Sequence, residues 1–248
     1  MVFQLKHEPT TILLDWSTYP ESDGEPMAET LRNQTTMING QFAARHLLEQ
    51  QGRTNVAVGG NQFIYYTEGN GLDHISPDMY IALDVPPGGR PKWQTWVEGK
   101  FPDIVFEISS PSTQDIDLGH KVVLYGRLGA KEYYVFDPQL AMRPALRAYR
   151  RQGARLVRVA LSPGPELRVF SPLLHTDLVV REHDLRIINP QTGEPLLTPE
   201  EEAAARRAAE QAQHEAEQAQ RAAEERAVQA EAALQAALAE LARRISDG

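Results

Sequence analysis

Three ionisable residues, Asp78, Glu107 and Lys121, lie within apolar stretches of this 248-residue chain. Asp78 precedes Met-Tyr-Ile-Ala-Leu, Glu107 is enclosed in Ile-Val-Phe-Glu-Ile, and Lys121 is followed by Val-Val-Leu-Tyr. Two carboxylates supply the hard oxygen ligands that Mg²⁺ prefers, and a lysine can orient a nucleophile or stabilise charge on phosphorus. Together the three predict a metal-dependent phosphodiesterase, with all three residues catalytic and Asp78 and Glu107 as metal ligands.

The apolar run around Glu107 predicts a strand over residues 103–109. Because side chains alternate along a strand, Glu107 shares one face with Val105 and Ser109. A strand that leads into a crossover helix is normally covered on both faces, so this carboxylate would lie in a mostly apolar layer. Such burial costs several kcal/mol unless a partner such as a divalent cation is present. A sheet-edge glutamate that reaches water is the alternative interpretation.

The segment 113–128 predicts a helix that Gly129 ends. On that helix Lys121 shares a face with Leu124 and Leu128, which we expect to face the sheet. Lys121 would then lie on the buried side, with its ammonium directed at the site of Glu107. The alternative is a buried stem whose ammonium reaches solvent.

Asp78 follows Pro77 at the start of a predicted strand over 79–85, where an aspartate can also be a simple turn former. A strand is expected over 132–137, so the order strand, helix, strand from 103 to 137 predicts a parallel crossover. Segments 54–58 and 62–67 are expected to pair as a hairpin. Upstream, residues 27–51 predict one helix, with a break near Gly40. The expected fold class is therefore α/β.

Composition narrows the functional classes. The net charge is −9 and the chain contains no cysteine. An acidic protein needs a local basic patch to bind nucleic acid, and the absence of cysteine excludes disulfides and thiolate metal sites. The sequence shows no signal peptide and no apolar run of about 18 residues, so we expect a cytoplasmic protein without a membrane span.

A basic patch is present in a predicted hairpin over 145–151 and 154–161. Arginines crowd this region while Glu166 is the only acid near them. They can hold a phosphate backbone, or they can be solvated hairpin charges. The candidates for DNA binding are Arg143, Arg147, Arg150, Arg151, Arg155 and Arg158. In the loop 86–100, Trp93 and Trp96 either stack on bases or cap the core.

The composition changes at Pro199. Residues 199–245 are mostly Ala, Glu, Gln and Arg, with no proline after the first position and no glycine, which predicts one long helix. Leu234, Leu238, Leu241 and Ile245 recur at heptad spacing, so we expect a coiled coil that self-associates. A lone solvated helix is the alternative. The expected organisation is a core domain over 1–198 and a helical tail over 199–248.

The chain resembles the Uma-two family of the PD-(D/E)XK nuclease superfamily, most closely its longer bacterial versions with an Ala/Glu-rich tail. The resemblance covers about residues 19–198 and is carried by residues 23–25, 58–68, 77–78, 102–113, 117–125 and 132–138. It implies a restriction-endonuclease-like core, with a central mixed sheet flanked by helices. It also implies cleavage of DNA by an endonuclease that depends on Mg²⁺ or Mn²⁺.

In that resemblance Asp78 and Glu107 match the two acids of the superfamily. Ser109 stands where the usual lysine would be, two residues after Glu107, and Lys121 is the matching lysine in this family. Glu29 on the first helix is a candidate accessory acid, or a solvated glutamate at a helix start. Superfamily nucleases often act as dimers, so a homo-oligomer is expected. The alternative function is an inactive nuclease-fold module that oligomerises through its tail.

Overall fold

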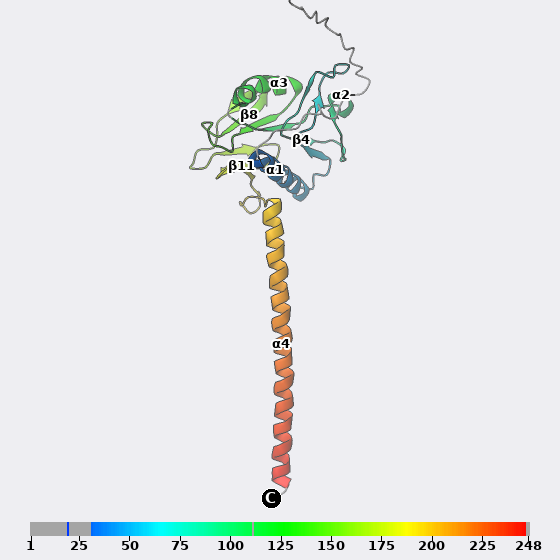
Figure 1. Cartoon of the computed structure of the whole chain (residues 1–248), viewed down its shortest axis with the longest axis vertical. Coiled ribbons are helices and arrows are strands. Elements are labelled where there is room, and N and C mark those ends of the chain that lie inside the picture. The colour runs from blue at the N-terminus through cyan, green and yellow to red at the C-terminus, as the bar shows by residue number, and fades with distance from the viewer. Residues whose placement is uncertain (1–18, 20–30, 111, 247–248) are drawn as a thin grey trace, which may run out of the picture. The chain divides into compact units, whose positions relative to one another are not determined.

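A computed structural model describes residue 19, residues 31–110 and residues 112–246. The chain divides into two compact units, Met1–Leu196 and Leu197–Gly248 (Figure 1). The first unit holds all the described strands and the shorter helices, and the second is the long helix α4 (Pro199–Ser246).

A six-stranded mixed sheet forms the centre of the first unit. Its strand order is β1-β4-β6-β7-β8-β9. Strands β6 and β7 are parallel, and the other neighbours are antiparallel. The expected α/β class, with a mixed central sheet, is therefore confirmed. The strands are β1 (Val56–Gly59), β4 (Met79–Leu83), β6 (Ile104–Ile108), β7 (Glu132–Phe136), β8 (Leu146–Gln152) and β9 (Arg155–Val159).

Helices cover both faces of this sheet (Figure 1). Helix α1 (Leu31–Gln50) packs Leu47 and Leu48 onto the face that contains Phe106. The helix is continuous, so the expected break near Gly40 is wrong. A Cβ at Gly40 would lie 3.0 Å from the sulfur of Met79, which shows that this glycine permits close helix–strand packing rather than a break.

A π-helical turn, η1 (Ile116–His120), and helix α3 (Lys121–Leu128) cover the other face. The buried residues of α3 are Tyr125 and Gly126, whereas Leu124 is only partly buried. Leu128 packs partly buried against this face, as expected, but the completely buried side chain of the helix is that of Tyr125, which the sequence pattern did not place there. The π turn contains one more residue than an α turn, and this shifts the phase of the helix that follows it.

Two small sheets complete the unit. One contains β10 (Arg168–Ser171), β11 (Thr176–Arg181) and β12 (Asp184–Ile187). The other contains β3 (His74–Ile75), β2 (Ile64–Tyr65) and β5 (Trp93–Gln94), which is followed by the single-turn helix α2 (Thr95–Glu98).

The predicted hairpin between 54–58 and 62–67 is wrong, because β1 pairs with β4 while β2 belongs to a separate sheet. Gly60 packs against the backbone of Asp78, and Asn61 has a positive φ of 50°. After β1 the chain therefore continues into a separate sheet and does not turn back in a tight hairpin to pair with β1.

Helix α4 begins with reciprocal hydrogen bonds between Thr198 and Glu201. The Thr198 hydroxyl accepts from the Glu201 amide, and the Glu201 carboxylate accepts from the Thr198 amide, which satisfies two helix-end donors. Leucines of the heptad pattern are 55–61% exposed, namely Leu234, Leu238 and Leu241. Within the described residues, no helix is long and apolar enough to cross a membrane.

Candidate active site

The antiparallel register of β4 and β6 places Asp78 beside Glu107. Met79 pairs with Phe106, so the next position along each strand brings the two acids opposite each other. An Asp78 carboxylate oxygen accepts a hydrogen bond from the backbone N–H of Ile108 at 2.5 Å. The two predicted ligands thus lie side by side.

Lys121 reaches the same place from the start of α3. Its Nζ lies 2.9 Å from Glu107 Oε2 and 2.9 Å from Asp117 Oδ1. The two carboxylates are only 3% and 2% exposed, while the lysine side chain is 18% exposed. The structure therefore directs this ammonium at buried acids rather than at solvent.

Two tyrosines fix the acids around Lys121. Tyr125 donates its hydroxyl hydrogen bond to Glu107 Oε1 at 2.5 Å, and Tyr133 donates to the backbone carbonyl of Asp117 at 2.9 Å. Neither Asp117 nor Tyr125 was predicted to have a role in the site. Their spacing contained the signal, because they stand four residues before and four residues after Lys121, on the same side of a helix.

Burial dominates the electrostatics of the acids. Desolvation, together with the neighbouring Asp78, raises the pKa of Glu107 to about 8, although Lys121 and Tyr125 oppose the shift. Desolvation also raises the pKa of Asp78, against the hydrogen bond from Ile108 and the charge of Lys121. For Lys121, desolvation lowers the pKa, but Glu107 and Asp117 outweigh it and the net pKa is raised. The pair of acids therefore favours a bound positive charge.

The donor set fits a hard divalent cation. Asp78, Glu107 and Asp117 carry three negative charges when ionised, and Lys121 supplies one positive charge. A divalent ion would balance the remaining two charges. In the described part of the chain no group of three His, Cys, Asp or Glu side chains is arranged to hold a metal. An ion that keeps several waters and takes one or two carboxylates, as Mg²⁺ does, matches this pair.

Ser109 lies on the same strand face as Glu107 and is almost completely buried. Its hydroxyl has no hydrogen-bond partner among the described residues. The position two residues after Glu107, where the resemblance implies a lysine, is therefore occupied by a small neutral group, while the ammonium of Lys121 on the helix lies beside Glu107.

Other predicted candidates are placed differently. Glu29 lies outside the described residues, as do residues 23–25. Trp93 is completely buried, and its indole N–H donates to the Lys100 carbonyl at 2.9 Å, so it belongs to the core. Trp96 contacts the ring of Tyr19 at 5.3 Å between centroids.

The arginine candidates do not form one patch. Arg150 donates to the carbonyl of Phe170, and Arg151 donates to that of Gly126, so backbone oxygens hold both. Arg143 is exposed, at the start of the turn before β8. The two that share a concave surface are Arg147 and Arg158.

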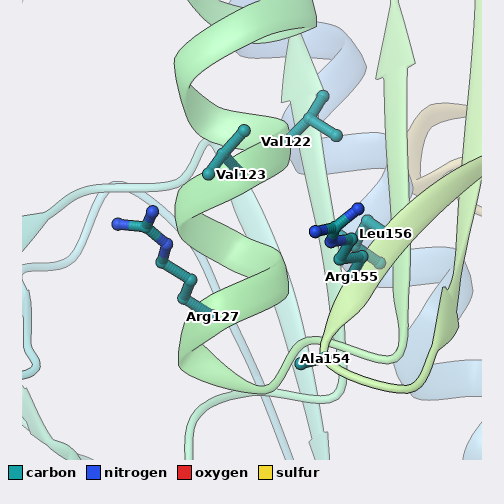
Figure 2. Close-up of a pocket in the computed structure, with 6 residues that line it drawn as sticks. All are labelled: Val122, Val123, Arg127, Ala154, Arg155 and Leu156. Carbon is teal, nitrogen blue, oxygen red and sulfur yellow. The ribbon is translucent and has the colours of Figure 1, made fainter.

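A cavity of about 500 Å³ lies elsewhere. Figure 2 shows its lining on α3 and on the hairpin between β8 and β9. Arg127 and Arg155 are its charged residues, and none of Asp78, Glu107 or Lys121 lines it. It therefore contributes no acid or base to the site.

A family model described as "Uma2: Putative restriction endonuclease" matches residues 18–181. The search of curated proteins gave no match. A solved structure, described as a putative nuclease belonging to DUF820 from Anabaena variabilis ATCC 29413, superposes with a TM-score of 0.41 at 16% identity. That alignment covers 57% of this chain and 75% of the other.

Proposed function

The chain belongs to the Uma2 family, and we propose that it is a divalent-metal-dependent endonuclease that hydrolyses phosphodiester bonds in DNA. One observation carries the proposal. Asp78 and Glu107 meet on neighbouring strands, with Lys121 Nζ 2.9 Å from Glu107. Paired acids and a lysine are the groups that phosphodiester hydrolysis needs.

Asp78 and Glu107 would hold Mg²⁺ or Mn²⁺ through their carboxylate oxygens. When bound, the ion supplies a water of lowered pKa and neutralises charge on the phosphoryl oxygens. Tyr125 orients the Glu107 carboxyl group through its hydrogen bond, so that this acid has a fixed position before the substrate arrives.

Lys121 would contact the reacting phosphate. Its ammonium is a compact donor that stabilises negative charge as water adds to phosphorus and the bond to the leaving oxygen breaks. Asp117 keeps the ammonium in place when Glu107 is occupied, because its ion pair with Lys121 is independent of Glu107.

Nicking of supercoiled plasmid in Mg²⁺ or Mn²⁺ tests the function. Asp78→Asn and Lys121→Ala are expected to lower the rate at least about 100-fold, as loss of charge-stabilising groups does in other enzymes. Lys131→Ala is a matched control, since Lys131 also pairs with a buried acid, Asp103, but lies at the opposite end of β6. Wild-type cutting by the Lys121→Ala protein refutes the proposal.

A second candidate function is an inactive nuclease-fold module that assembles through its tail. Ser109 at the usual lysine position and the exposed leucines of α4 favour it. We propose that the tail associates with a second copy in either case, because exposed leucines at heptad spacing are buried when helices pair.

A further inference from the structure

Arg147 and Arg158 line one concave surface on the β8–β9 hairpin, a cavity of about 340 Å³. The rest of its lining is aliphatic, so these two guanidinium groups are its only charged members. Arg158 pairs in register with Tyr149, which places it diagonally across the strands from Arg147. Diagonal neighbours on one face of a sheet are about 7–8 Å apart, within reach of long side chains.

Neither guanidinium has an acidic partner. Within the part of the chain that the structure describes, no carboxylate lies within ion-pair distance of Arg147 or Arg158. Arg147 is held by the carbonyl of Pro144 at 2.7 Å. Burial and the nearby charge of Arg158 lower the pKa of Arg147. Two like charges that face a common cavity repel each other, and a bound anion would relieve this repulsion.

The two arginines lie on the face of the candidate active site. Glu107 on β6 is in register with Val135 on β7, and Val135 is in register with Arg147 on β8. Residues in register on neighbouring strands point to the same face. At about 4.8 Å per strand, Arg147 is therefore roughly 10 Å from Glu107 across the sheet.

We propose that Arg147 and Arg158 form a phosphate-binding subsite that holds the DNA backbone beside the cleavage site. This subsite rests on the proposed nuclease function for the identity of its ligand. A separation of roughly 10 Å corresponds to about three nucleotides at 3.4 Å of rise along the duplex axis. A guanidinium pair suits this role, because its planar donors match phosphate oxygens.

Neighbouring arginines have other roles. Arg150 is three residues from Arg147 on the same strand, so it points to the opposite face, where Phe170 accepts its hydrogen bond. Arg168 is neutralised by Glu166 and Asp177. Arg155 lies on the same hairpin but lines the cavity of Figure 2. The subsite therefore predicts a sharp difference between arginines only a few residues apart.

Fluorescence anisotropy of a labelled 20-base-pair DNA duplex in EDTA tests the subsite without any cleavage. Arg158→Ala is expected to weaken binding about 5- to 10-fold and to reduce the slope of log K against log salt by about one. Arg158→Lys should retain part of the affinity. Arg155→Ala, on the same hairpin, is the matched control and should bind like the wild type.

The possible results separate the two proposals. If the wild type binds the duplex and Arg158→Ala matches Arg155→Ala, the subsite is wrong while the nuclease proposal stands. If the wild type does not bind the duplex in EDTA but nicks plasmid in Mg²⁺, the subsite is wrong while the nuclease proposal stands, and if it neither binds nor nicks, both are wrong for DNA. A titration with inorganic phosphate alone shows whether the two arginines bind free anions. If phosphate saturates the protein at micromolar concentration but does not affect binding of the duplex, the subsite would also be overturned.

Discussion

Asp117 Oδ1 lies 2.9 Å from Lys121 Nζ, so the lysine that faces Glu107 is anchored by a second buried acid. The π-helical turn before α3 carries Asp117, and Tyr133 holds the backbone of that turn through the Asp117 carbonyl. The lysine is thus positioned by the helix as well as by the candidate metal ligand. Lys121, on the helix, therefore supplies the positive charge that Ser109, at the end of the strand, cannot.

Substitution of Asp117 should lower the rate of the reaction more than it weakens binding of the substrate. Asp117→Asn keeps the shape of the side chain and the Tyr133 contact but removes the charge that holds Lys121. Loss of such an outer partner typically costs 10- to 100-fold in activity, and we expect a fall in kcat of that order with KM nearly unchanged. Steady-state nicking kinetics measure both constants. A kcat equal to that of the wild type would show that Asp117 has no positioning role.

The raised pKa of Glu107 predicts how stability depends on pH in the metal-free protein. Glu107 binds its proton more tightly when folded, so its contribution is fully present below pH 4.5 and is lost as the pH rises through about 8. Asp78, Lys121 and Tyr125 face this group and share the titration. Since one pKa unit is worth about 1.4 kcal/mol and the pKa of Glu107 rises from 4.5 to about 8, the full loss should be on the order of 5 kcal/mol.

Urea unfolding in EDTA between pH 5 and pH 8 measures this change, and Glu107→Gln provides the comparison. The variant cannot ionise at this position, so its free energy of unfolding should vary less with pH than that of the wild type. Equal pH dependence in the two proteins would mean that Glu107 titrates normally.

Gly60 positions Asp78 through its lack of a side chain. A Cβ at Gly60 would lie 2.1 Å from the carbonyl oxygen of Asp78, closer than any contact permits. Gly60→Ala should therefore displace Asp78, destabilise the fold by about 1–3 kcal/mol or more, and weaken divalent-ion binding. Gly89→Ala is the control, because nothing lies within 4 Å of its added Cβ. Denaturant unfolding and Mn²⁺ titration report the two effects.

The local pattern of residue types in the sequence predicted much of the fold. The runs around Glu107 and at 132–137 are short, apolar and β-branched or aromatic, and they became the adjacent parallel strands β6 and β7. The hairpin between β8 and β9 was also predictable, since Gly153 separates two alternating segments. The tail helix followed from its composition alone.

Features that depend on tertiary contacts were not predictable in this way. Strand β1 pairs with β4, which is distant in the sequence: Val58 pairs with Ile81, 23 residues further along the chain. Strand β4 is buried along its whole length. The phase of α3 depends on a π turn that no residue type specifies. At the site, the spacing of Asp117, Lys121 and Tyr125 indicated a shared helix face, but only the fold shows which acids that face meets.

The tail is predicted to associate with a second copy. Changing Leu234, Leu238 and Leu241 together to alanine removes the exposed apolar side chains while keeping strong helix formers. Sedimentation equilibrium should show a dimer or larger species for the wild type and a lower mass for the triple variant. Substituting two exposed alanines of the same helix, Ala222 and Ala223, with glutamine is the control. A monomeric wild type would contradict the prediction.

The central claim is that Asp78 and Glu107 bind one divalent ion together. Crystals soaked in Mn²⁺ test it most directly, through anomalous scattering at the manganese edge. We predict a single peak within coordinating distance of both carboxylates, and no peak there in Asp78→Asn crystals. Saturating Mn²⁺ with no anomalous peak near either acid, and Lys121 still bound to Glu107, would contradict the account.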